Sequence, residues 1–240
     1  MRLTNVRMIG VGAVALVIVP AVASHAQSPN AKAPYPTMAP VEQYLMPDRL
    51  EEIALARTAA PAAISRDAEI LVLGRHGYET AVKGKNGFGC LVDRAWDAGF
   101  DEPGFWNPKI RGPVCYNPPA VKSILPLVLE RARFALAGLT KAQIMDSTTA
   151  ATTRKFNPPL APGAMCYMMS KEAYLTDDGG HNLAHLMFYA PQVDGTVLGA
   201  DVQGSPVIIG QHSVPGTPEP ITEFYVRVPK WSDGTPAGSH

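Results

Sequence analysis

The sequence predicts an α+β fold, in which two to three helices pack on an antiparallel sheet. Three short apolar runs lie in residues 70–92, and two helical patterns follow in residues 118–155. About four further strand-like runs lie in residues 164–229. Strands and helices that occupy separate parts of a chain, without regular alternation, are typical of α+β proteins with antiparallel sheets.

The N-terminal residues have the pattern of a secretory signal peptide. Arg2 and Arg7 form a basic start without acids, and an apolar run of about 16 residues follows. Ser24 and Ala26 supply the small side chains that a signal peptidase needs. The alternative is a transmembrane anchor, but a span needs roughly 20 residues. We therefore expect export to the periplasm or outside the cell after cleavage near Ala26, with no membrane span remaining.

Cleavage after Ala26 leaves 214 residues, a length at which chains often form one core. Residues 27–40 are rich in Pro and Ala without an apolar period, which predicts a flexible linker after the signal peptide of residues 1–26. No internal repeat or shift in composition divides residues 41–228, so we expect a single domain there. Residues 229–240 read as a loose polar tail.

The charge of the mature chain argues against nucleic acid as a partner. The signal peptide holds two of the 21 basic residues and none of the 21 acids, so the remaining net charge is −2. Binding to a phosphate backbone or an anionic membrane surface needs clustered Lys and Arg, and the sequence contains no such cluster. A small molecule, a saccharide or another protein stays open as the partner.

The first predicted elements are a helix and a three-stranded antiparallel meander. Asp48 can cap a helix that Pro61 ends. The Asn86-Gly87 pair favours a tight hairpin, because both turn positions need a positive φ. The three strand-like runs are residues 70–73, 78–82 and 88–92.

Two helices are predicted after a long loop rich in Pro and Gly. Asn117 precedes two prolines, a helix-start pattern, and Pro126 should kink the helix that follows. Gly138 is suited to end it, and Thr140 with Gln143 has the spacing of a capping box for a second helix at about 141–155. The remaining strand-like runs are residues 113–117, 164–170, 185–191, 205–210 and 221–229.

Three cysteines predict one disulfide, because an exported protein meets an oxidising compartment. Three pairings are possible. We favour Cys90 with Cys115, since both lie near the ends of strand-like segments that one long loop joins. Such a bond would stabilise the fold by roughly 3 kcal/mol. Cys166 would then be a buried thiol in an apolar strand-like run.

The stretch "TDDGGHNLAH" is a candidate metal site. His181 and His185 are four residues apart beside Asp178, and zinc is bound by histidine nitrogens and carboxylates. On a helix both rings would face one ion, but the glycines before His181 do not favour a helix. In an extended chain the rings stand about 13 Å apart. The alternative is a Gly-rich turn with partly exposed histidines.

The loop "RAWDAGFDEPGFWNPKIR" is a candidate ligand site. Trp96 and Trp106 lie there with Arg94 and Arg111, and aromatic faces beside charged groups suit sugars or flat polar ligands. The alternative is that these aromatic side chains hold the loop against the sheet as a small satellite core.

No linear catalytic motif supports a specific reaction: the G-x-S-x-G, phosphate-loop and C-x-x-C patterns do not occur. The segments "NGFGC", "PVC", "AMCYMMS" and "HLMFYAP" resemble exported bacterial proteins of unknown function, and the resemblance implies export but no activity. Our hypothesis is a non-catalytic ligand-binding or interaction module without a cofactor. The alternatives are a metal-dependent hydrolase that uses His181 and His185, and a structural protein without a small ligand.

Overall fold

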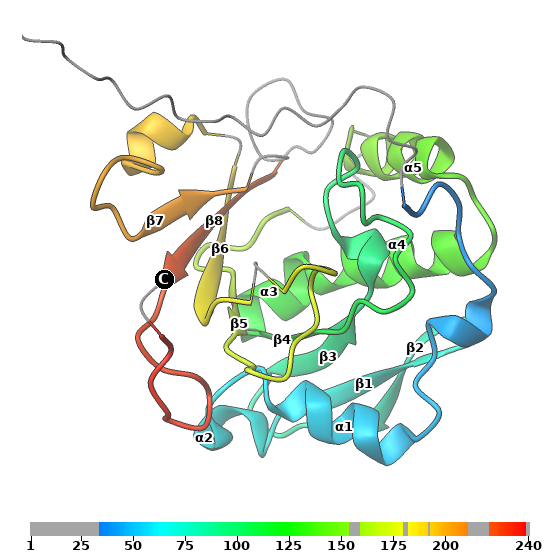
Figure 1. The fold of residues 1–240 in the computed structure, drawn as a ribbon, viewed down its shortest axis with the longest axis horizontal. Coiled ribbons are helices and arrows are strands. Elements are labelled where there is room, and N and C mark those ends of the chain that lie inside the picture. The colour runs from blue at the N-terminus through cyan, green and yellow to red at the C-terminus, as the bar shows by residue number, and fades with distance from the viewer. Residues whose placement is uncertain (1–33, 154–158, 180–181, 192, 211–220, 239–240) are drawn as a thin grey trace, which may run out of the picture. The chain divides into compact units, whose positions relative to one another are not determined.

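The computed structural model describes residues 34–153, 159–179, 182–191, 193–210 and 221–238. The described residues form one eight-stranded, mostly antiparallel sheet in the order β2-β1-β3-β4-β5-β6-β8-β7 (Figure 1). The strands are β1 (Glu69–Gly74), β2 (Gly77–Val82), β3 (Gly89–Asp93), β4 (Gly112–Tyr116), β5 (Met165–Met168), β6 (His185–Pro191), β7 (Val207–Ile209) and β8 (Ile221–Arg227).

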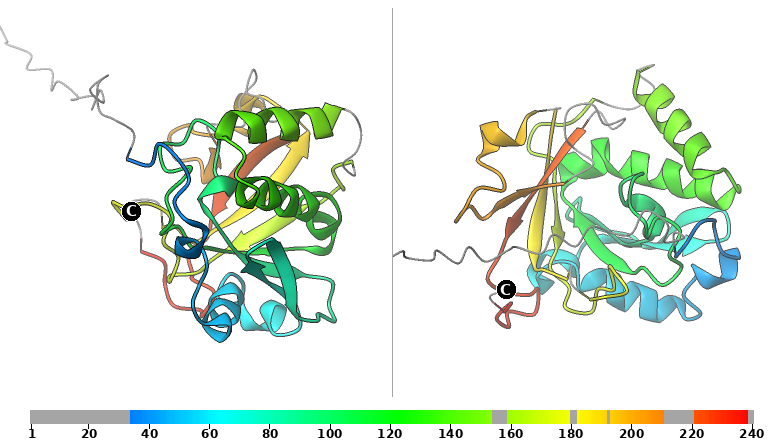
Figure 2. Two further views of the ribbon diagram at one scale, coloured as in Figure 1. Left: turned by 90° about the vertical axis from the view of Figure 1, so that its right-hand side faces the viewer. Right: turned by 45° about the horizontal axis from the view of Figure 1, so that its top comes forward.

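Helices cover both faces of the sheet (Figure 2). The α-helices are α1 (Arg49–Arg57), α2 (Ala62–Ser65), α3 (Pro118–Ser123), α4 (Leu125–Leu136) and α5 (Lys141–Thr153). Short 3₁₀ turns are η1 (Val41–Gln43), η2 (Ala95–Asp97) and η3 (Gly195–Leu198). The predicted α+β class is therefore confirmed. Among the described residues, no helix has the length and apolar character needed to cross a membrane.

The predicted meander is wrong in its strand order. β1 lies between β2 and β3 and is parallel to β3, so the hairpin is the one that joins β1 to β2. The reason is burial: residues 70–73 are all buried, which suits an inner strand, whereas Glu79 and Thr80 are exposed and suit an edge. Asn86-Gly87 instead lies in the connection between β2 and β3. In this connection the Lys85 N–H donates to the Asp67 carbonyl, just before β1.

The predicted helix starts at Asp48, Asn117 and Thr140 are confirmed, whereas the first helix ends at Arg57, before Pro61. The Asp48 carboxylate accepts a hydrogen bond from the Leu50 N–H at 2.7 Å. The helix after Asn117 is broken rather than only kinked, because Pro126 lies in the first turn of α4. Gly138 adopts φ +80° after α4. Thr140 and Gln143 form the expected capping box, with bonds of 2.9 and 3.3 Å.

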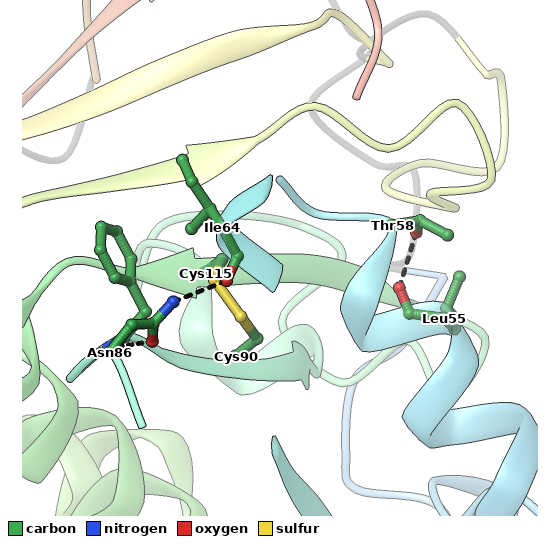
Figure 3. The surroundings of a disulfide bond; sticks show 7 residues. Leu55, Thr58, Ile64, Asn86, Cys90 and Cys115 are labelled. Carbon is green, nitrogen blue, oxygen red and sulfur yellow. Dashed lines mark hydrogen bonds between the residues drawn. A yellow bond between two sulfur atoms is a disulfide. The ribbon is translucent and has the colours of Figure 1, made fainter. Parts of the chain in front are cut away.

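The side chains of alternate strand residues build a separate core on each face. The α3–α4 face includes Leu91, Tyr116 and Cys166, and the α1–α2 face includes Ile70 and the cysteine pair Cys90–Cys115. Cys90 and Cys115 lie opposite each other on β3 and β4 with their sulfur atoms at bonding distance, close to Ile64 of α2 (Figure 3). The favoured cysteine pairing is therefore present, and Cys166 is the buried free thiol.

Both ends of the described chain pack against the domain. Tyr35, in the segment predicted as a linker, contacts the aromatic core described below. The C-terminal segment, predicted as a loose tail, forms a loop in which the Trp231 N–H donates to the Thr235 carbonyl at 2.9 Å. The Ser232 N–H donates to the Met169 carbonyl at 2.9 Å and joins this loop to the end of β5.

Candidate functional site

The aromatic loop between β3 and β4 packs into a core instead of lining a surface site. Trp96 is fully buried and its ring centroid lies 4.8 Å from that of Tyr44. Trp106 is only 5% exposed, and its ring meets Phe105 edge to face at 4.7 Å. This is the satellite core that the sequence left open as an alternative to ligand binding.

Arg94 is buried in a network of hydrogen bonds with other protein groups. Its Nη2 lies 2.7 Å from Glu52 Oε1 on α1, and its Nε donates to the Tyr44 carbonyl at 2.7 Å. Its Nη1 donates to the Val92 carbonyl. The same Glu52 oxygen accepts from the Leu73 N–H at 3.2 Å, so one carboxylate joins α1 to β1 and to the aromatic loop. No local sequence pattern marks Glu52 as the partner of Arg94.

Arg111 connects two loops. Its guanidinium donates to the carbonyl oxygens of Pro108 and Ile110, and more weakly to that of Gln43 at 3.2 Å. Burial, with a smaller effect of the positive charge on Arg94, lowers the pKa of Arg111 to about 10. The four residues predicted to bind a ligand thus lie in one region, where three are buried and Arg111 is half-buried.

The predicted metal ligands are only partly within the described residues. His181 lies outside them, so the set with Asp178 and His185 stays a prediction. His185 Nδ1 lies 2.6 Å from the Leu183 carbonyl, which leaves Nε2 as the nitrogen that could bind a metal. Burial lowers the pKa of His185 and favours its neutral form. Within the described ranges, no three His, Cys, Asp or Glu side chains gather in a way that could hold a metal ion.

Asp93 is a half-buried residue at the end of β3. Burial raises the pKa of Asp93 well above its usual range, the nearby Asp97 raises it further, and Arg94 opposes both effects. Glu223 on β8 and Arg131 on α4 act on it more weakly, in opposite directions. Its Oδ1 is buried without a hydrogen bond to any other described residue. Carboxyl groups with raised pKa values occur at functional sites, where they can transfer protons.

Replacing Asp93 with Asn is expected to stabilise the protein near neutral pH by on the order of 1 kcal/mol, the scale of the penalty for an unsatisfied buried polar group. Because the pKa of Asp93 is higher in the folded state than in the unfolded state, the contribution of Asp93 to wild-type stability falls as pH rises above about 4. Urea unfolding of both proteins from pH 4 to pH 8 should show that the stability difference between wild type and Asp93→Asn grows with pH and vanishes at the acidic end. Asp101→Asn, at an exposed position nearby, is the control; equal stability of wild type and Asp93→Asn throughout would refute the prediction.

A surface cleft of about 330 Å³ lies where the start of β6, the end of β8 and the C-terminal loop meet. Arg227 of β8 and Trp231 of the loop both line it. Arg227 is exposed, and its guanidinium makes no hydrogen bond or ion pair with any residue that the structure describes. The other lining residues are Asn182, Leu183, Ala184, Val228, Pro229, Ala237 and Gly238.

This cleft was not predicted from the sequence, because the polar residues 229–240 have the composition of a loose tail. The only sequence signal was an arginine at the end of a strand, followed four residues later by a tryptophan. The loop brings the tryptophan back because the Val228 N–H donates to the Ala184 carbonyl at 2.9 Å and the Ala237 N–H to the Pro229 carbonyl at 2.9 Å.

Comparison with known proteins identifies no relative. No protein-family model matches the sequence, and no match is found among curated proteins or among solved structures.

Proposed function

We propose that the protein is exported and binds a small organic anion in the cleft between Arg227 and Trp231. The observation that carries the proposal is an arginine without an ion-pair partner among the described residues, placed beside a tryptophan in a concave site. Export is supported by the signal-peptide pattern of residues 1–26 and by the Cys90–Cys115 pair, which suits an oxidising compartment.

The lining of the cleft favours an anion with an apolar or aromatic body. A guanidinium binds a carboxylate through two parallel hydrogen bonds, which fixes the orientation of the ligand. The indole of Trp231, with Leu183, Val228 and Pro229, supplies apolar surface on which a ring can lie. A volume of about 330 Å³ is near the lower end for ligand sites, which favours a small molecule over a polymer.

The side chains of the cleft favour binding over catalysis. A guanidinium such as that of Arg227 can hold an anion but is a poor general acid or base. Among the described residues that line the cleft there is no Asp, Glu, His or Cys. These described lining residues therefore supply no side chain for general acid–base chemistry.

Arg227→Gln is expected to weaken binding of benzoate, a small aromatic carboxylate, by at least about tenfold, since it removes a charge-assisted hydrogen bond. Isothermal titration calorimetry at low ionic strength measures the dissociation constant, and the melting temperature should stay unchanged because Arg227 is exposed. Lys230→Gln removes a neighbouring positive charge that does not line the cleft, so it is the matched control. Wild-type protein that binds no benzoate, or Arg227→Gln with unchanged affinity, would contradict the proposal.

A further inference from the structure

Among the strands that the structure describes, β7 lies at one edge of the sheet and pairs with β8. On its inner side, the Pro206 carbonyl accepts from the Arg227 N–H at 3.4 Å and the Gly210 N–H donates to the Glu223 carbonyl at 3.0 Å. Because backbone groups alternate along a strand, the N–H and C=O groups of Val207 and Ile209 point away from the sheet. Such an outward row of groups is a template for pairing with another chain.

A loop of the same chain occupies this edge. The Asp201 N–H donates to the Val207 carbonyl at 3.0 Å, and the Val207 N–H donates to Ser205 Oγ at 3.1 Å. Asp201 Oδ2 accepts from the Ile209 N–H at 3.5 Å. Residues 201 and 205 thus satisfy three of the four outward groups of β7, as a neighbouring strand would.

The loop holds Asp201 in an unusual conformation to do this. Asp201 has φ +56°, in the left-handed region that few non-glycine residues adopt. Aspartate tolerates this region better than most residues do. A sparsely populated conformation persists only where the surrounding structure enforces it, and here it brings the N–H and the carboxylate of one residue to the same strand edge.

Exposed apolar side chains near β7 would favour self-association if this edge were open. Val197 is 77% exposed and Val202 is 59% exposed, and both lie in the segment that leads into β7. An edge strand flanked by exposed apolar residues favours association with another chain.

We propose that the loop of residues 199–206 is a built-in cap that prevents β7 from pairing with the β7 of a second copy. If two β7 strands paired antiparallel about a two-fold axis at Ile208, Val207 of one copy would lie opposite Ile209 of the other. The outward groups of these two residues are therefore self-complementary. A second copy is therefore the partner that this edge fits once the cap is removed. The proposal concerns a different surface from the cleft and does not depend on ligand binding.

The double variant Asp201→Gly/Ser205→Ala tests the cap. Glycine keeps the left-handed conformation, while the carboxylate and hydroxyl acceptors are lost. Sedimentation equilibrium of the full-length mature protein should show self-association at least about tenfold tighter than in the wild type, the effect of losing one or two hydrogen bonds that compete with pairing. Asp194→Ala is the control, because it removes the bond to the Thr196 N–H in the same segment but leaves the β7 edge closed.

Adding Ile209→Pro to the double variant identifies the surface. Proline removes an outward N–H and leaves the β7–β8 bonds in place, so it should return the protein to the wild-type association state. Far-UV circular dichroism checks the fold of each variant, and Ser205→Ala alone replaces the double variant if that variant does not fold. Unchanged association of the uncapped variant, or association that persists with Ile209→Pro, would overturn the proposal.

Discussion

Glu52→Ala is expected to lower the free energy of unfolding by about 3–5 kcal/mol, because it leaves a buried guanidinium without its counter-ion. The Arg94 side chain is 0% exposed and that of Glu52 is 2% exposed, so water cannot replace the lost carboxylate. The Leu73 N–H, which donates to the same carboxylate, would also lose its partner. Urea unfolding at neutral pH, followed by circular dichroism, measures the change.

The controls for this ion pair separate the buried charge from the loss of a side chain. Glu51→Ala removes an exposed acid one position earlier on α1 and should change stability by less than about 0.5 kcal/mol. Glu52→Ala/Arg94→Met removes both charges and should cost less than the sum of the single changes, because no buried charge is left unpaired. A loss below about 1 kcal/mol in Glu52→Ala would mean that Arg94 finds another counter-ion or reaches water.

Reducing the Cys90–Cys115 bond is expected to destabilise the protein by roughly 3 kcal/mol. The two cysteines are 25 positions apart, and opening the loop between them raises the conformational entropy of the unfolded chain. Urea unfolding of the wild type with and without reductant measures the loss in the free energy of unfolding. Because no residue is substituted, no cavity contributes to the difference. Both residues are fully buried, so reduction should need partial unfolding or a strong reductant.

The third cysteine provides the control for the reduction experiment. Cys166 is buried as a free thiol, its Sγ lies 3.4 Å from the Tyr189 hydroxyl, and burial raises its pKa. Cys166→Ala should keep the full stability difference between oxidised and reduced protein. Thiol titration in denaturant should find one free thiol in the oxidised wild type and none in Cys166→Ala. Three thiols in the wild type would show that the bond does not form.

The proposed cleft and the capped edge both involve the C-terminal strands of the sheet. Arg227 ends β8, the strand that pairs with β7, so both features depend on the position of β8. The predicted ligand loop lies far from them in the sequence, and its aromatic side chains stabilise the domain interior. The two proposals are separable by experiment, because Arg227→Gln changes the cleft and Asp201→Gly changes the edge.

The sequence by itself determined the features that depend on neighbouring residues. The cap at Asp48, the capping box at Thr140 and the turn at Gly138 each involve groups within about four positions, so their patterns are visible in a single sequence. Strand positions followed from short apolar runs for the same reason. The cysteine pairing was also foreseen, since two of the three cysteines lay beside strand-like segments.

Only the tertiary structure decided how these elements meet. β1 became an inner strand because its continuous apolar run had to be covered on both faces, and that requirement overrode the local turn signal at Asn86-Gly87. Glu52 and Arg94 are 42 positions apart, and Arg227 meets Trp231 in a cleft only because the C-terminal loop folds back. Burial and long-range pairing depend on the packing of the whole chain, and local sequence patterns carry little information about them.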